Sequence, residues 1–277
     1  MKKDYHVVSF SGGKDSTAML LKMVEKGMQV DCILFCDTGL EFPAMYNHIQ
    51  EVEKRIGRGI TVVRAKEKFE YMMFDKPIAR RMDSSVVQKY GGTQNGYGWP
   101  GPRLRWCTER LKNEPRNKYI RALREKYNVI EYVGLAADEG YRLQRKCNQN
   151  PNHRHPLIEW GMTESDCLDY CKELGFTWNG LYDHFKRVSC WCCPLQSLTE
   201  LRKLYRYYPS LWEKLKEWDK KTWRTFRVGY SVEQLEIRFE LEQEYKTLGK
   251  PVNNKAFFVA LKERMHGAET TNARQSV

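Results

Sequence analysis

Residues 9–16, with the sequence SFSGGKDS, have the composition of a loop that binds phosphate groups. Its adjacent glycines can adopt backbone conformations that other residues avoid, so amide groups can converge on phosphate oxygens. The spacing matches neither the Walker A loop nor the dinucleotide fingerprint GxGxxG. A glycine turn that binds nothing is the alternative, but a match between a predicted strand and a predicted helix favours phosphate binding. The residues concerned are Ser9, Ser11, Gly12, Gly13, Lys14, Asp15 and Ser16.

Cys190 and Cys193 are separated by two residues in the segment CWCCP. This spacing lets two thiolates meet one metal ion, one iron–sulfur cluster or one disulfide. One such pair cannot complete a four-coordinate site, so Cys192 is a further candidate ligand if the backbone bends, and Cys147 competes with it. An iron–sulfur cluster, expected to hold four irons and four sulfurs, is the first interpretation. Zinc is the second and free thiols the third, because spacing does not separate iron from zinc.

Residues 202–227 interleave lysines and arginines with tyrosines and tryptophans, in a chain with 47 basic and 35 acidic residues and a net charge of +12. Cations for phosphates and aromatic faces for bases are what contact with nucleic acid, either tRNA or DNA, requires. The alternative is a pair of amphipathic helices whose aromatic side chains pack inward while the lysines face solvent. Both interpretations predict helices in this region.

The elements that must position these residues alternate between strand and helix. Strands are expected at 5–10, 30–35, 60–63 and 129–135, and helices at 15–26, 43–56, 109–126 and 164–174. Thr163 is expected to be the N-cap of the helix at 164–174, and Gly175 is expected to end that helix. This alternation predicts an α/β fold: a twisted, mostly parallel sheet with helices on both faces.

Two further stretches interrupt the alternation. Residues 75–106 contain many glycines and prolines and predict a long loop over the site. From residue 197 the pattern is helical, so we expect a nucleotide-binding α/β domain over 1–196 and a basic, aromatic-rich helical region over 197–277. The content of 41% hydrophobic and 30% charged residues excludes a disordered chain. The sequence shows neither a signal peptide nor a membrane span, so we expect a cytoplasmic protein with no membrane partner.

The chain resembles a known family at several segments. SGGKDS is similar to the PP-loop of the adenine nucleotide α-hydrolase superfamily. Four segments resemble its phosphoadenosine phosphosulfate (PAPS) reductase branch, in family order: FCDTGLEFP (35–43), RWCTERLK (105–112), GLAADEGYRL (134–143) and HPLIEW (155–160). The resemblance implies a parallel sheet with an adenine nucleotide lying across the carboxyl ends of its strands.

The resemblance also implies roles for individual residues. Residues 35–39 would lie beside the adenosine, Gly134 at the ribose, and Asp138 and Arg142 near the phosphate or sulfur-bearing end. It brings Cys107 to the active-site face as a third metal ligand. The nucleotide-binding set is thereby extended by Phe35, Asp37, Thr38, Gly39, Gly134 and Asp138. The expected catalytic residues are Lys14, Asp15 and Arg142, and the expected metal ligands are Cys107, Cys190, Cys192 and Cys193.

Three functions are compatible with these patterns. The first is an enzyme that cleaves ATP to AMP and pyrophosphate, with Mg²⁺, and activates an acceptor for sulfur transfer from a sulfur donor. The second is a reductase of PAPS or adenylyl sulfate that uses an electron donor protein. Such reductases generally carry a nucleophilic cysteine in an ECGLH-type segment, whereas no cysteine follows Cys193 in this sequence. The third is a non-catalytic module that binds nucleotide or nucleic acid. The sequence does not indicate the oligomeric state.

Overall fold

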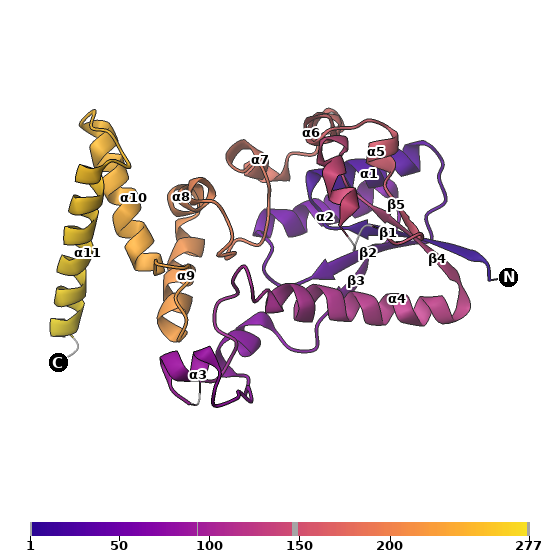
Figure 1. Cartoon of the computed structure of the whole chain (residues 1–277). Coiled ribbons are helices and arrows are strands. Elements are labelled where there is room, and N and C mark those ends of the chain that lie inside the picture. The colour runs from indigo at the N-terminus through magenta and orange to yellow at the C-terminus, as the bar shows by residue number, and fades with distance from the viewer. Residues whose placement is uncertain (1, 93, 146–148, 276–277) are drawn as a thin grey trace. The chain divides into compact units, whose positions relative to one another are not determined.

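The chain forms two compact units, each made of two separate segments (Figure 1). The computed structural model describes residues 2–92, 94–145 and 149–275, with side chains up to residue 267. The first unit contains residues 1–69 and 105–191, and the second contains residues 70–104 and 192–277. The segment 70–104, which includes most of the predicted loop, therefore belongs to the same unit as the C-terminal helices.

The first unit is built on a parallel sheet of five strands in the order β3-β2-β1-β4-β5. The strands are β1 (Asp4–Phe10), β2 (Cys32–Asp37), β3 (Thr61–Arg64), β4 (Asn128–Val133) and β5 (His153–Arg154). The chain runs outward from β1 to one side through β2 and β3, and then returns to the other side of β1 with β4. In open α/β sheets, ligands bind at the carboxyl ends of the strands where the order reverses in this way.

Helices cover both faces of this sheet, as the alternation predicts. Figure 1 shows α4 on one face and α1, α2, α5 and α6 on the other. The helical segments of the unit are α1 (Lys14–Glu25), α2 (Pro43–Ile56), the π-helical η2 (Thr108–Asn113), α4 (Glu114–Lys126), the 3₁₀ segment η3 (Ala137–Gln144), α5 (Pro156–Glu159), α6 (Glu164–Glu173), η5 (Trp178–Gly180) and α7 (Leu181–His184). The α/β fold class expected from the sequence is confirmed.

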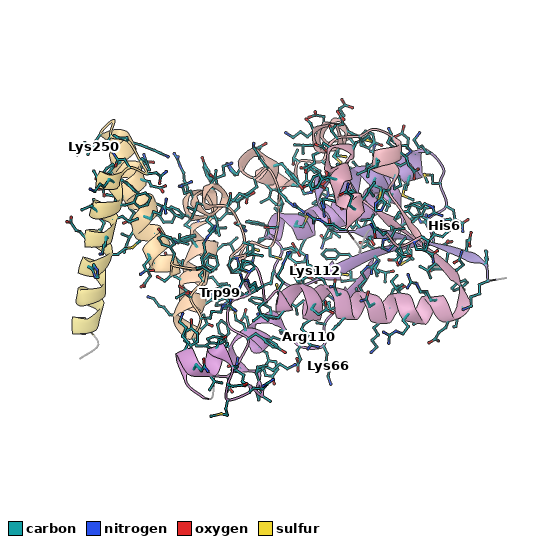
Figure 2. The ribbon with its side chains drawn as sticks, in the orientation of Figure 1. His6, Lys66, Trp99, Arg110, Lys112 and Lys250 are labelled. Atoms are coloured by element: carbon teal, nitrogen blue, oxygen red, sulfur yellow. The ribbon has the colours of Figure 1, made fainter. Side chains whose placement is uncertain are left out.

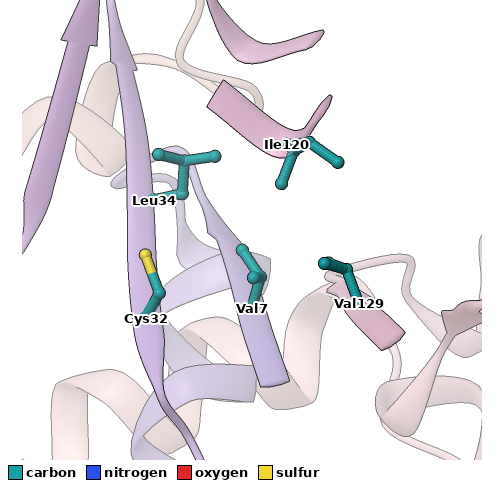
Figure 3. Close-up of a cluster of buried hydrophobic side chains, with 5 residues drawn as sticks. All are labelled: Val7, Cys32, Leu34, Ile120 and Val129. Carbon is teal, nitrogen blue, oxygen red and sulfur yellow. The ribbon is translucent and has the colours of Figure 1, made fainter. Parts of the chain in front are cut away.

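The core beneath α4 shows how alternation within the strands creates two buried faces. Val7, Cys32, Leu34 and Val129 point from the strands to one side and pack with Ile120 of α4 (Figure 3). The intervening residues of β1 and β2 are buried as well, because successive side chains of a strand point to opposite faces and helices cover both.

The second unit consists of η1 (Tyr71–Asp75), α3 (Ser85–Tyr90), α8 (Leu198–Tyr207), α9 (Pro209–Lys221), α10 (Val232–Thr247) and α11 (Lys255–Gln275). Asp219 joins three of its segments, because its carboxylate accepts hydrogen bonds from the Trp99 indole (2.9 Å) and from the backbone N–H groups of Phe226 (2.9 Å) and Val232 (2.7 Å). These bonds fix the turn between α9 and α10 and attach the 70–104 segment to it.

Two details differ from the sequence expectations. β2 begins at Cys32 instead of residue 30, because the Asp31 carboxylate accepts the His6 N–H (2.8 Å) before the strand ladder starts. The expected loop at 75–106 contains a short helix, α3, whose N-cap Ser84 accepts the Val87 N–H at 3.3 Å. Elsewhere that loop depends on glycine: a Cβ at Gly96 would lie 2.0 Å from the Met73 carbonyl oxygen.

Candidate functional site

The predicted phosphate loop is closed by hydrogen bonds among its own residues. The Ser16 hydroxyl oxygen accepts the Ser11 N–H at 3.1 Å and lies 3.0 Å from the Ser11 hydroxyl. The same Ser16 hydroxyl donates to the Gly13 carbonyl at 3.0 Å. The loop therefore has a defined shape at the amino-terminal end of α1, where the helix dipole favours an anion.

Gly12 is the residue on which this shape depends most. Its φ of +77° lies in the left-handed region, and a Cβ there would meet the Met45 sulfur at 2.6 Å. Its carbonyl oxygen accepts the Trp178 indole N–H at 2.8 Å. Trp178 itself has a φ of +50°, which is a strained conformation for a bulky side chain. The loop is thus held by a strained tryptophan from a distant part of the sequence.

A buried histidine supports the same tryptophan. The His48 ring stacks on the Trp178 ring with centroids 4.2 Å apart, and its Nε2 lies 3.0 Å from the Thr17 hydroxyl of α1. Burial lowers the pKa of His48 to about 3, so the ring stays neutral at physiological pH. His48 and Trp178 were not predicted as site residues.

The amino terminus of α1 carries a hydrogen-bond acceptor from α7. The Lys14 N–H donates to the Tyr182 hydroxyl at 2.8 Å. Burial raises the pKa of Tyr182, so its hydroxyl stays protonated. An oxygen thereby accepts one of the N–H groups that a bound phosphate would use.

The Lys14 side chain lies between two carboxylates. Its ammonium is 2.5 Å from Glu164 Oε2 and 3.3 Å from Asp15 Oδ1. Burial opposes the charge of Lys14, but the Glu164 hydrogen bond and both carboxylate charges outweigh it and raise its pKa. Burial also raises the pKa of Asp15 to about 6, with smaller contributions from Glu164 and Glu139, while Lys14 acts against the shift. The ammonium group of the lysine expected to bind phosphate is therefore already paired with two carboxylates.

The loop after β4 approaches the phosphate loop closely. A Cβ at Gly134 would lie 3.0 Å from the backbone nitrogen of Ser16, so only glycine fits there without displacement. Asp138 Oδ1 accepts the Glu164 N–H at 3.1 Å, and Arg142 donates to Glu139 at 2.6 Å within η3. Two predicted site segments, 11–16 and 134–138, therefore meet where the strand order reverses.

The predicted adenosine segment lies at the end of β2. Asp37 Oδ1 accepts from the Gly39 N–H and the Tyr46 hydroxyl, both at 2.9 Å, while its Oδ2 accepts from Arg64 Nε at 2.8 Å. Thr38 donates to Glu41 at 3.3 Å. The side chain of Phe35 belongs to the core, with 3% exposure. Ser9, at the end of β1, has a buried hydroxyl with no hydrogen-bond partner among the described residues.

The cysteines expected to bind metal are divided between the units. Cys107 and Cys190 lie in the first, whereas Cys192 and Cys193 lie in the second. Cys147 lies outside the described residues. Within the parts of the chain that the structure describes, no group of three or more histidine, cysteine, aspartate or glutamate side chains is placed to hold a metal ion.

Lys112 connects three thiols of the first unit electrostatically. Burial opposes its charge, yet Cys190, Glu41 and Cys36 together raise its pKa, and its ammonium lies 3.6 Å from the Glu41 carboxylate. Burial raises the pKa of the Cys107 and Cys36 thiols, and Lys112 acts against both shifts. Figure 2 labels Lys112 where η2 leads into α4. The sequence analysis places Cys36 within the segment 35–39 expected beside the adenosine and Lys112 within the family-like segment 105–112, but it names neither as a metal-site residue.

The basic stretch 202–227 is largely committed to packing within the second unit. Arg202 pairs with Glu242 of α10, and three lysines lie within ion-pair distance of glutamates: Lys214 with Glu70, Lys216 with Glu236 and Lys220 with Glu233. Trp212 and Trp218 are buried, with exposures of 1% and 4%. The amphipathic-helix interpretation accounts for these residues, and neither buried tryptophan offers a face to a base.

No described helix has the length and apolar character needed to cross a membrane. The residues that sequence reasoning missed lie far from the loop along the chain, as the spacing of 168 residues between Lys14 and Tyr182 illustrates. Glu164 was noticed only as part of a helix start. No local pattern marks such long-range partners.

The chain is similar to members of one known protein family. The model of the phosphoadenosine phosphosulfate reductase domain family matches residues 5–196. An uncharacterized protein of Methanocaldococcus jannaschii is 29% identical over 217 residues, which cover 75% of this chain and 40% of that protein. Adenosine 5′-phosphosulfate reductase 2 of Bacillus subtilis is 28% identical over 192 residues, covering 65% of this chain and 68% of the reductase.

Among solved structures, phosphoadenylyl-sulfate (PAPS) reductase from Candida auris aligns with a TM-score of 0.43 and 17% identity, over 69% of this chain and 82% of that one. The chain spans less than half the length of the Methanocaldococcus relative. The family match covers the sheet, the phosphate loop and both loops that follow β2 and β4. On that match, which extends over more than half of its residues, the chain belongs to the phosphoadenosine phosphosulfate reductase domain family.

Proposed function

We propose that the chain binds an adenine nucleotide at the carboxyl ends of β1 and β4 and cleaves ATP to AMP and pyrophosphate, activating an acceptor for sulfur transfer. The observation that carries the proposal is the loop at the start of α1, where the Lys14 N–H already holds an oxygen acceptor, the Tyr182 hydroxyl, at 2.8 Å. A phosphate oxygen can take the same place, because both are hydrogen-bond acceptors and the helix terminus favours the more negative one.

In the proposed reaction an oxygen of the acceptor attacks the α-phosphorus of ATP. The bond from that phosphorus to the oxygen bridging to the β-phosphorus breaks, and pyrophosphate leaves with the bonding electron pair. The adenylated acceptor then loses AMP when a sulfur donor attacks the activated carbon. The loop amides would stabilise the charge that develops on pyrophosphate, a preorganised electrostatic contribution.

Lys14 and Asp15 take specific parts in this proposal. Glu164 holds the Lys14 ammonium at 2.5 Å, so Lys14 would reach a phosphate only by exchanging one anion for another. Asp15 would supply the carboxylate oxygen that Mg²⁺ prefers, because Mg²⁺ commonly binds one or two carboxylates together with substrate phosphates. Arg142, now bonded to Glu139, is the further proposed contact for the phosphate end.

The experiment is a turnover assay with ATP labelled at the α-phosphate, in the presence of Mg²⁺ and candidate acceptors. Formation of AMP and pyrophosphate in equal amounts, lost in Gly12→Ala, supports the proposal. Binding of ATP without turnover under all conditions would favour a non-catalytic nucleotide-binding module. No binding of any adenine nucleotide would contradict the proposal altogether.

A reductase of adenylyl sulfate or PAPS is the second candidate. The family match and the 28% identity to the Bacillus subtilis reductase favour it. In that reaction a thiol attacks the sulfur of the substrate, AMP or its 3′-phosphate leaves, and an electron donor later releases sulfite. Release of sulfite from adenylyl sulfate in the presence of a dithiol reductant, with no cleavage of ATP, would select this function over the first.

The proposed metal site at Cys107, Cys190, Cys192 and Cys193 is tested separately. The thiols are suitable donors for an iron–sulfur cluster, with zinc as the alternative, but no reaction step is assigned to either. Protein purified without oxygen would be analysed for iron, acid-labile sulfide and zinc, alongside Cys190→Ser and Cys193→Ser. Iron matched by sulfide and lost in both variants would support a cluster, whereas protein without bound metal would leave these residues as thiols.

A further inference from the structure

A pocket of about 300 Å³ lies on the second unit between the start of α10 and α11. Leu261 and Met265 contribute apolar surface to it. Two aromatic rings and three polar or cationic side chains complete the lining: Tyr230, Phe258, Gln234, Lys262 and His266. Pockets that bind ligands have this composition, with apolar walls and a few polar groups that fix orientation.

A buried arginine holds the two aromatic rings of the pocket in place. The Arg238 guanidinium lies 5.7 Å from the Tyr230 ring centroid and 5.8 Å from that of Phe258. It is fixed by hydrogen bonds to Glu242 (2.9 Å), Asn253 (2.9 Å) and the Tyr230 hydroxyl (3.0 Å). The rings are therefore preorganised, which lowers the entropy cost of stacking a flat ligand against them.

Cations lie on either side of the exposed ring along α11. Phe258 is 45% exposed, although Phe257 beside it is fully buried in the contact with α10. Lys255 and Lys262 lie three residues before and four residues after Phe258, so all three share one face of the helix. No ion pair to Lys255 or Lys262 exists among the side chains that the structure describes, in contrast to Lys214, Lys216 and Lys220.

We propose that this pocket binds single-stranded nucleic acid, with a base stacked on Phe258 and the adjacent phosphate near Lys262. An aromatic face flanked by cations suits a base joined to phosphates, because stacking is tolerant of sequence and the cations follow the backbone. The net charge of +12 favours a polyanion, and the cations of 202–227 that are tied to glutamates do not supply the contact. The proposal goes beyond ATP cleavage and does not depend on it.

The test measures the affinity of the full chain for a fluorescein-labelled oligouridylate by fluorescence anisotropy at several salt concentrations. Phe258→Ala is expected to weaken binding by about 5-fold to 150-fold, the range for loss of one stacked base. Phe258→Leu keeps apolar bulk without the flat face and should weaken binding similarly. Lys262→Gln should lower the slope of log affinity against log salt by about 0.7, the value for one phosphate contact on a single strand.

Matched controls separate the pocket from general surface effects. Val259→Ala changes a neighbouring side chain that is 50% exposed and outside the pocket, and should leave affinity within about twofold. Arg206→Gln removes an exposed cation of α8 outside the pocket and should likewise leave affinity within about twofold. Thermal melts would confirm that each variant is folded.

Three outcomes would overturn the proposal. In the first, folded Phe258→Ala binds the oligouridylate with unchanged affinity. In the second, Arg206→Gln weakens binding as much as the pocket variants were expected to. An acidic peptide of similar charge could also compete as well as the oligonucleotide and depend equally on Phe258, which would make the partner a protein. Loss of ATP cleavage alone would bear on the proposed function and leave this site unaffected.

Discussion

One cluster of charged groups in the first unit and one in the second differ in how their acids and bases are balanced. In the first, Lys14, Asp15 and Glu164 gather at one helix end, where the strand order reverses and a left-handed glycine opens the loop. In the second, the Glu242 carboxylate is 2% exposed and binds both Arg202 and Arg238. The first arrangement leaves carboxylates competing for one cation, whereas the second satisfies its acid with two bases. We interpret the first cluster, in which two carboxylates share one lysine, as suited to ligand binding. We interpret the second, in which one carboxylate has two arginine partners, as a stabilising ion pair.

Breaking the saturated cluster should give the largest effect on stability. Glu242→Gln leaves Arg238, buried in the same cluster, without its carboxylate, and removing one partner of a buried pair costs about 3–5 kcal/mol. Urea denaturation followed by tryptophan fluorescence would measure the loss. Nucleotide affinity of the folded variant should be unchanged, since the cluster belongs to the second unit.

A matched control exists on the same helix. Glu244 forms a two-pronged pair with Arg264, with distances of 2.7 and 2.8 Å, but both side chains are exposed. Glu244→Gln should cost less than about 1 kcal/mol. Equal losses in the two variants would contradict the distinction between buried and exposed pairs.

Altering the loop should affect binding in the first unit. Gly12→Ala forces a side chain into a φ of +77° and against the Met45 sulfur, which should cost about 1–3 kcal/mol and weaken nucleotide binding by at least about tenfold. Calorimetric titration would measure the affinity. Gly27→Ala at the other end of α1 is the control, since its φ is +62° with no atom within 4 Å. Nucleotide affinity lost equally in both would refute the specific role of Gly12.

The competing charges also predict a pH dependence. Because the pKa of Asp15 is raised from 3.8 to about 6, the folded state binds its proton more tightly than the unfolded chain does. The contribution of Asp15 to stability is therefore present below pH 3.8 and lost as pH rises through about 6, on the order of 3 kcal/mol in all. The difference in unfolding free energy between Asp15→Asn and wild type should change across that window, as measured by denaturation at each pH. A constant difference would contradict the raised pKa.

A smaller effect is expected from the Tyr182 hydroxyl of α7, which accepts the first N–H of α1. Tyr182→Phe removes the hydroxyl from the Lys14 N–H and should cost about 1 kcal/mol without nucleotide. Saturating nucleotide should shrink this deficit, because a phosphate would replace the missing acceptor. Thermal melts with and without ATP would show it. Tyr170→Phe, which loses a hydrogen bond to Glu25, is the control and should show a deficit that nucleotide does not change.

Local patterns in the sequence predicted much of the first unit. Strand and helix alternation gave the parallel sheet, and the capping box at Thr163 with Asp166 fixed the start of α6. The expected end of α2 is confirmed by Gly57, which adopts φ +63°. These features depend on neighbouring residues, so a single sequence displays them.

Long-range partners could not be predicted in the same way. The Lys14 ammonium donates to Glu164, and the Lys14 backbone N–H donates to the Tyr182 hydroxyl. Both partners lie more than a hundred residues away in the sequence. The tryptophans of the 202–227 region illustrate the converse: their aromatic character was visible, but whether a ring faces solvent or core depends on α10, which the local pattern does not contain. The roles of the predicted nucleotide and metal residues stay predictions until they are tested.

The discontinuous second unit has a consequence for synthesis of the chain. Residues 70–104 leave the ribosome well before α8 to α11, the helices with which they form a unit. The first unit is complete once residue 191 has emerged, but 86 further residues separate that point from residue 277. At about 5–20 residues per second, Trp99 waits on the order of ten seconds for the carboxylate of Asp219 and its aromatic neighbours. During translation this segment therefore lacks the helices of its own unit until they have been synthesised.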